Sequence, residues 1–255
     1  MLPPWGRSVI FVDWHGVLSR DLFWTSILNS PMHPLRPRLE IELAEIFARD
    51  QPTAHDWMKG RLSSADIIAA MRLAIPARYR QDYLARQLGE DFHGMIINTG
   101  LVELLGRFRP DAFVVLATDN MDCFADAVGR IYDRRDRRDR PTRPRRLRHT
   151  PRRPASPVSQ FAACVAGCDD LLCSSEVGAL KSEDPRTFFA PWLDQHDLTF
   201  ADAILIDDRA DNCAAFAEQG GTALRWKLGT DPLGHLEEPL NRWFLLTGSS
   251  PVQHA

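Results

Sequence analysis

The sequence of 255 residues contains no uninterrupted apolar run of the ~18 to 20 residues that a membrane-spanning helix needs. Its first residues, Met1-Leu2-Pro3-Pro4, do not begin a signal-peptide pattern. Cysteine is scarce, with five residues, an odd number, and no spacing typical of a small secreted scaffold. We therefore expect a soluble, cytoplasmic protein that does not depend on disulfides.

Basic residues are concentrated in one segment. The formal net charge of the chain is −3, yet the stretch from Asp133 to Pro154 holds 11 Arg and 3 Asp, a local charge of +8. The Arg- and Pro-rich residues 133–157 contain too few apolar side chains to form a core, and we predict a disordered insertion. The alternative is a nucleic-acid-binding arm, which is less favoured because no aromatic residue between Arg134 and Gln160 could stack on bases.

Short β-branched and aromatic runs alternate with helical periodicity along much of the chain. The predicted strands are 8–12, 112–116, 171–173, 203–206 and 222–224, and the predicted helices are 101–107, 122–132, 185–195 and 212–219. This alternation is typical of an α/β fold with a doubly wound parallel sheet covered on both faces. In such sheets ligands bind at the carboxyl ends of the strands.

The segment after the first strand has only helical patterns. It contains apolar helical repeats at 39–47, 67–73 and 79–88, with Ser63 and Asp66 as a capping-box start and Gly89 as an end signal. We predict an inserted all-helical domain at residues 20–95. The α/β core is then formed by residues 1–19 and 96–255.

Polar residues follow four of the predicted strands. If the strands are parallel, their ends bring together a carboxylate, a hydroxyl, an ammonium and an acidic pair, which suits a phosphoryl group and a hard divalent cation. The residues concerned are Asp13-Trp14-His15-Gly16, Thr118-Asp119-Asn120, Lys181, and Asp207-Asp208 with Asn212.

The order and spacing of these four features resemble the haloacid dehalogenase (HAD) superfamily of hydrolases, subfamily I, whose members carry a helical C1-type cap after the first motif. The first motif of that family is an apolar run, Asp, any residue, Asp and Gly, and this chain has Phe11 to Gly16 there. The segment Gly178 to Pro185 resembles the family's lysine motif, with one extra residue and Ser182 in place of the usual proline.

This resemblance implies a Mg²⁺-dependent phosphatase that hydrolyses a small phosphate monoester through an aspartyl-phosphate. Asp13 would be the nucleophile. Thr118, the backbone N–H of Asp119 and Lys181 would bind the phosphoryl group, and Lys181 would also neutralise charge on the nucleophile. Such an enzyme would act as a monomer or a homodimer.

The resemblance also implies a magnesium site. Asp13, the main-chain carbonyl of His15 and Asp208 would hold the ion, and Asp207 would act through water or through Lys181. The inserted helices would close over the substrate. Trp14, Phe23, Trp24 and residues 57–60 are candidates for the lining of the site; the alternative for these residues is ordinary core, which we favour for Trp57.

His15 departs from the family pattern, which places a second aspartate there as the general acid and base. An imidazole can donate and accept protons near neutral pH, so His15 could take this role. It could instead position the substrate, or mark a degenerate domain used for binding. A dehalogenase or a phosphonatase is a further alternative; dehalogenases of the superfamily lack the second aspartate but usually dispense with magnesium, which the pair Asp207-Asp208 argues against.

Overall fold

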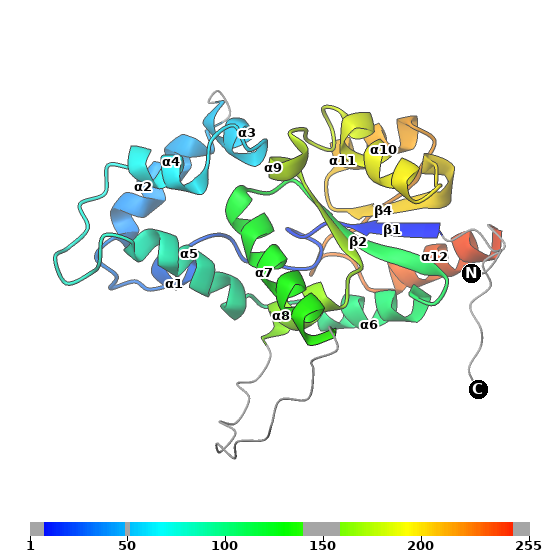
Figure 1. Ribbon diagram of the computed structural model, residues 1–255, viewed down its shortest axis with the longest axis horizontal. Helices are drawn as coiled ribbons and strands as arrows, with labels where there is room; N and C mark the ends of the chain where they lie inside the picture. The colour runs from blue at the N-terminus through cyan, green and yellow to red at the C-terminus, as the bar shows by residue number, and fades with distance from the viewer. Residues whose placement is uncertain (1–7, 49–51, 140–158, 247–255) are drawn as a thin grey trace, which may run out of the picture.

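The computed structural model describes residues 8–48, 52–139 and 159–246. Its centre is a five-stranded, all-parallel sheet in the order β3-β2-β1-β4-β5 (Figure 1). The strands are β1 (Ser8–Val12), β2 (Ala112–Thr118), β3 (Asp170–Cys173), β4 (Ala203–Asp207) and β5 (Thr222–Arg225). The predicted parallel α/β fold is confirmed, and the five predicted strands are all present.

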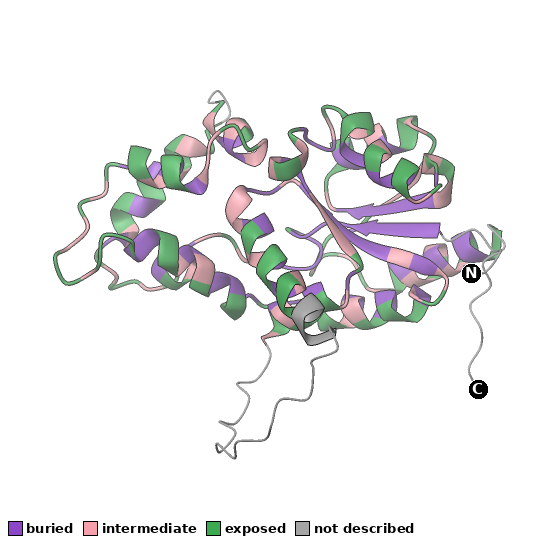
Figure 2. Ribbon diagram, in the orientation of Figure 1, coloured by how far each residue is buried: buried purple, intermediate pink, exposed green. Residues whose placement is uncertain are grey.

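Helices cover both faces of the sheet. Successive side chains of each strand point to opposite faces, so each strand presents apolar side chains to both layers of helices. Ile10 and Val12 of β1 pack into one hydrophobic cluster, and Val9 and Phe11 pack into the other. Every residue of β1 is buried, as expected for the central strand of a doubly wound sheet, and β1 and β4 are purple along their length in Figure 2.

The two layers of helices contribute large apolar side chains to these clusters. One layer contains α10 (Pro185–Gln195) and α11 (Ala210–Glu218), shown above the sheet in Figure 1. The other contains α6 (Thr99–Phe108), α7 (Asp122–Asp139), α8 (Gln160–Ala166) and α12 (Gly234–Leu246). The short helices α9 (Ser174–Val177) and η1 (Phe200–Asp202) precede α10 and β4, respectively.

Between β1 and β2 the chain forms the insert helices, a name used here for α1 to α5. They are α1 (Thr25–Leu28), α2 (Arg36–Ile46), α3 (Thr53–Met58), α4 (Ser64–Ala70) and α5 (Tyr83–Gly94). They lie beyond the carboxyl ends of the strands, on the left of Figure 1. The described residues of the segment 20–95 contain no strand.

The start of α4 follows the predicted capping box. The Ser63 hydroxyl accepts a hydrogen bond from the Asp66 N–H at 3.1 Å, and Asp66 Oδ2 accepts one from the Ser63 N–H at 2.8 Å. The predicted end of the last insert helix at Gly89 is wrong, since α5 continues to Gly94. Burial of Leu88 and Phe92 on one face of α5 holds the helix together across Gly89.

The start of the predicted disordered insertion is also wrong. Helix α7 continues to Asp139, so residues 133–139 are helical. Phe124, Val128 and Ile131 fix the first turns of α7 in the core, and arginine propagates a helix well. Residues 140–157 of the prediction lie outside the described residues.

No helix in the described part of the chain combines the length and the apolar content that crossing a membrane requires.

Candidate active site

Asp13 lies where the central strand β1 ends. Its N–H donates to the Ile206 carbonyl at 2.9 Å, which extends the pairing with β4 by one residue. Its side chain is almost buried, and the chain then turns through residues 14–19, with the Leu18 and Ser19 N–H groups both donating to the Trp14 carbonyl. The parallel sheet therefore places this carboxylate between the ends of β2 and β4.

Lys181 joins three strand ends. Its Nζ donates to Asp13 Oδ1 at 2.8 Å, to Asp207 Oδ2 at 2.5 Å and to the Ala117 carbonyl at 3.0 Å. The side chain is fully buried. All three protons of the ammonium group thus have acceptors, and the lysine that the sequence associates with the site reaches the predicted nucleophile.

The two acids after β4 have different surroundings. Asp207 is fully buried; its Oδ1 accepts from the Arg209 N–H at 2.9 Å, and its Oδ2 accepts from Lys181 and from Asn212 Nδ2 at 3.0 Å. Asp208 is half-buried. Asp207 is thus held by hydrogen bonds from its neighbours, and the roles predicted for the two acids stay predictions.

Gly16 makes room for Asp208. A Cβ at position 16 would lie 2.5 Å from Asp208 Oδ2, and Gly16 has a φ of +89°, a conformation that side chains rarely adopt. The glycine of the first motif therefore brings the loop after β1 against the acidic pair after β4.

A hard divalent cation fits this group of residues. Carboxylate oxygens of Asp13, Asp207 and Asp208 lie within 4.8 Å of one another. Beside them, Asn212 is buried and its Oδ1 has no hydrogen-bond partner among the described residues. These oxygen atoms are the type of ligand that Mg²⁺ prefers, and Asn212 Oδ1 is not already used in a hydrogen bond among the described residues. Mg²⁺ usually keeps several water ligands, so it needs only one or two of the carboxylates.

The charges in the cluster are unbalanced. Burial raises the pKa of Asp13 to about 7, although the Lys181 ammonium opposes this rise. Burial would lower the pKa of Lys181, but the carboxylates of Asp13, Asp207 and Asp119 together raise it above its ordinary value. A single buried ammonium thus faces several carboxylates, and a bound cation would relieve the excess negative charge.

The residues predicted to bind phosphate occupy the end of β2. Thr118 is buried and lies opposite Cys173 of β3 in the parallel register. Asp119 follows, and its Oδ1 accepts a hydrogen bond from the Lys181 backbone N–H at 3.0 Å. Burial raises the pKa of Asp119, with the Lys181 charge opposing it. The sequence predicts a role only for the backbone N–H of Asp119. The contact of the Asp119 side chain with Lys181 was not predicted.

A cavity of about 340 Å³ opens in front of these groups. Asp13, Asp119, Lys181 and Asp208 line it, and the exposed His15 side chain lies at its wall. Its other lining residues are Trp14, Asp21, Leu22, Phe23, Phe47, Met58, Met95, Asn120, Met121, Phe124, Arg209 and Asn212.

The predicted lining is correct only in part. Trp14, Phe23 and Met58 line the cavity. Trp24 and Trp57 instead form the core among the insert helices, both fully buried, with their indole N–H groups donating to the Leu84 carbonyl and to Ser64 and Asp122, respectively. These two rings are apolar packing with a satisfied polar end, so the core alternative, favoured for Trp57 from the sequence, holds for both.

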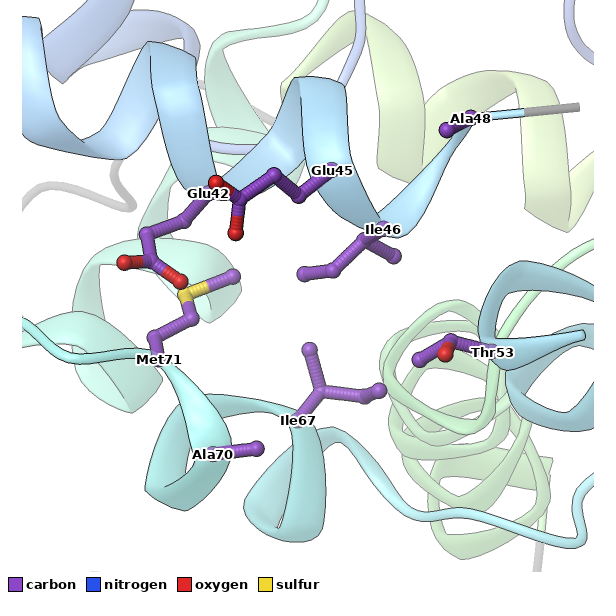
Figure 3. Close-up of a pocket in the computed structure, with 8 residues that line it drawn as sticks. All are labelled: Glu42, Glu45, Ile46, Ala48, Thr53, Ile67, Ala70 and Met71. Carbon is purple, nitrogen blue, oxygen red and sulfur yellow. The ribbon is translucent and has the colours of Figure 1, made fainter. Parts of the chain in front are cut away.

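A second cavity, of about 420 Å³, lies among the insert helices between α2, α3 and α4 (Figure 3). Glu42 and Glu45 lie on one side of it, and Ile46, Ile67 and Met71 supply apolar walls. Its described lining contains no cationic residue that could bind a phosphoryl group. None of the residues predicted for the site lines this second cavity.

Comparison with solved structures finds chains with the same architecture. A predicted HAD-like family hydrolase from Porphyromonas gingivalis has a TM-score of 0.59 at 15% identity, over 92% of this chain and 98% of that chain. A HAD family enzyme from Bacteroides thetaiotaomicron, solved in complex with magnesium and inorganic phosphate, has a TM-score of 0.56 at 17% identity, over 91% of this chain and 99% of that chain.

A haloacid dehalogenase is similar as well. L-2-haloacid dehalogenase from Xanthobacter autotrophicus, with chloropropionic acid covalently bound, has a TM-score of 0.53 at 10% identity, over 94% of this chain and 88% of that chain. No protein-family model and no curated protein matches the sequence. The chain therefore has the fold of the haloacid dehalogenase-like hydrolases, which confirms at the level of fold the resemblance predicted from its four motifs.

Proposed function

We propose that this protein is a magnesium-dependent phosphatase that hydrolyses a small phosphate monoester through an aspartyl-phosphate on Asp13. The observation that carries the proposal is the contact of Lys181 with both Asp13 and Asp207 at the bottom of a cavity, with Asp208 beside them. The similarity to an enzyme solved with magnesium and inorganic phosphate agrees with it.

Asp13 is the nucleophile in this proposal. Lys181 holds its Oδ1, while Oδ2 has no hydrogen bond among the described residues. A carboxylate oxygen attacks the phosphorus atom, the bond to the ester oxygen breaks, and the alcohol leaves. Water then attacks the phosphorus of the aspartyl-phosphate, which releases inorganic phosphate and restores the Asp13 carboxylate.

Lys181 and the acids supply the electrostatics. The Lys181 ammonium stabilises negative charge on Asp13 and on the phosphoryl oxygens, and the Asp119 carboxylate positions Lys181 through its backbone N–H. Asp13, Asp208 and the His15 carbonyl would hold Mg²⁺, with Asp207 acting through Lys181 and water. When bound, the ion supplies additional positive charge to the phosphoryl oxygens. Thr118 and the Asp119 N–H complete the proposed phosphate site.

His15 is the proposed proton carrier. Its imidazole is exposed at the cavity wall, within the loop that follows the nucleophile. A protonated ring nitrogen would donate to the leaving ester oxygen, and the neutral ring would then accept a proton from the attacking water.

Residues 20–95 form a helical cap in this proposal, and residues 1–19 and 96–255 form the core. The cap residues Leu22, Phe23, Phe47 and Met58 all line the cavity. A cap in this position would exclude water during the first step.

The dehalogenase alternative has less support. The acid cluster and the unpaired Asn212 Oδ1 suit a cation that superfamily dehalogenases usually do without. A binding domain with a basic arm depends on residues 140–157, which lie outside the described residues.

The test is phosphate release from phenyl phosphate by the purified chain, with Mg²⁺ and with a chelator. We expect turnover that requires Mg²⁺ and is lost in Asp13→Asn. Asp194→Asn, which changes an exposed aspartate on α10, is the matched control and should keep the wild-type rate. Equal rates in Asp13→Asn and the wild type would exclude the mechanism.

A further inference from the structure

We infer that the substrate of the proposed site is the phosphate monoester of an uncharged, apolar alcohol, selected by Leu22, Phe23, Phe47 and Met58. This inference rests on the proposed phosphatase function and adds the class of the leaving group. The argument is the distribution of charge and apolar surface in the cavity of about 340 Å³.

The polar and the apolar lining residues come mostly from different segments of the chain. The groups proposed for phosphate and metal follow the ends of β1, β2 and β4. Leu22, Phe23, Phe47 and Met58, which come from the segment between β1 and β2, form an apolar wall of the same cavity. Met95, Met121 and Phe124, all buried, add further apolar lining.

The apolar wall is open to a ligand. Leu22 is 54% exposed and Phe47 is 46% exposed, although both are large apolar side chains. Water contact with such side chains is unfavourable, and an apolar group bound between them would remove it. Met58, Met95 and Met121 are flexible side chains that can adapt to the shape of that group.

Cations for a second anionic group are lacking in the described lining. Lys181 is saturated by Asp13, Asp207 and the Ala117 carbonyl. Arg209 is the other lysine or arginine of the described lining, and its guanidinium makes two hydrogen bonds to Asp211. A carboxylate or a further phosphate on the leaving group would lie against Asp21 and the apolar wall with no cation to pair with, and burying such a charge is unfavourable.

Polar partners for a polyhydroxylated leaving group are few on the side chains that the insert segment contributes to the lining. Asp21 is the only charged residue that the described insert segment contributes to the lining, and its Oδ2 already accepts from the Ile96 N–H at 2.6 Å. Sugar hydroxyl groups placed against Phe23, Phe47 and Met58 would lose their hydrogen bonds to water. The wall therefore favours alkyl or aryl alcohols over sugars.

The test compares kcat/KM for ethyl, butyl and hexyl phosphate with that for glycerol 3-phosphate and glucose 6-phosphate, all with Mg²⁺. We expect kcat/KM to rise about fourfold per added methylene until the cavity is full, from the usual gain for burying a methylene group. The two polyhydroxylated esters should fall well below butyl phosphate.

Variants of the apolar wall test whether its side chains cause the preference for longer alkyl esters. Leu22→Ala and Phe47→Ala should reduce the ratio of hexyl to ethyl phosphate at least threefold. Ile41→Ala, which removes a similarly exposed apolar side chain of α2 that does not line the cavity, should leave the ratio unchanged. Circular dichroism spectra of the three variants should match that of the wild type.

The outcomes separate this inference from the proposed function. Turnover of sugar phosphates at or above the rate of the alkyl esters would overturn the inference and keep the phosphatase. An unchanged chain-length ratio in both folded wall variants would overturn the role of the wall. Absence of phosphate release from every ester would overturn the phosphatase and the inference together.

Discussion

Asp122 at the start of α7 holds Ser64 at the start of α4, so that one carboxylate joins the core to the insert helices. Both oxygens of Asp122 accept from the Ser64 N–H, at 3.0 and 2.9 Å, and Oδ1 also accepts from the Ser64 hydroxyl and from Trp57 Nε1. Asp122 follows β2 by only a few residues. This contact therefore fixes the insert helices relative to the proposed phosphate-binding loop.

Asp122→Ala should loosen the insert helices. The variant leaves the Ser64 N–H without its acceptor, at a cost of about 1 to 3 kcal/mol for a buried group, and the Trp57 indole N–H keeps only the Ser64 hydroxyl as acceptor. We expect faster amide hydrogen exchange in α3 and α4 and a higher KM for phenyl phosphate. Asp126→Ala, one turn further along α7 and exposed, is the control. Unchanged exchange in α3 and α4 would show that Asp122 does not hold these helices.

Lys181→Met should abolish turnover and destabilise the fold. It removes the only cation that contacts Asp13 and Asp207 in the described structure, and breaking a buried ion pair costs about 3 to 5 kcal/mol. The loss should be larger at pH 8 than at pH 6, because the unpaired Asp13 carboxylate is more costly once ionised. Thermal unfolding at both pH values measures this. A variant as stable as the wild type at pH 8 would contradict the described pairing.

Asp13 should make the metal-free protein less stable as the pH rises. Burial raises the pKa of this carboxyl to about 7 from an ordinary value of 3.8, so between these values the folded chain keeps a proton that the unfolded chain has lost. The free energy of unfolding then falls by up to about 1.4 kcal/mol per pH unit from this group.

Asp13→Asn removes this titration. In the presence of a chelator, the melting temperature of Asp13→Asn minus that of the wild type should increase from pH 5 to pH 8. Asp194→Asn, at an exposed site, should show a constant difference. A difference for Asp13→Asn that does not depend on pH would mean that the pKa of Asp13 is not raised by burial.

Substitution of His15 tests the proposed proton carrier. His15→Gln should reduce kcat for phenyl phosphate about 100-fold or more, the usual effect of losing a general acid and base. His15→Asp should preserve or raise activity, because a carboxyl group at this position can also transfer the proton. A pH profile of kcat should change its shape between the wild type and His15→Asp. An inactive, correctly folded His15→Asp would indicate a specific contact of the imidazole with the substrate.

The sequence predicts the strands of this fold well, because each is a short, largely apolar run with a polar residue at or just after its carboxyl end. It also predicts which of these polar residues converge, since parallel strands end at one edge of the sheet. Asp13, Lys181, Asp207 and Asp208 are all found together.

Contacts that depend on tertiary packing were not predictable. The Asp119 carboxylate reaches the Lys181 N–H only because β2 and the loop after β3 are neighbours. Phe47 lines the cavity from a segment with no motif. Helix α7 extends into the Arg-rich residues because its preceding turns are anchored in the core, which local composition does not reveal.

The most direct test of the account is chemical trapping at Asp13. The wild-type chain is mixed with phenyl phosphate and Mg²⁺, quenched in acid, treated with borohydride, which reduces an acyl phosphate to an alcohol, and digested for mass spectrometry. The account predicts homoserine in place of aspartate at position 13, at a level that follows turnover, and none in the absence of substrate. Steady turnover with aspartate intact at position 13, or with the modification on another residue, would contradict it.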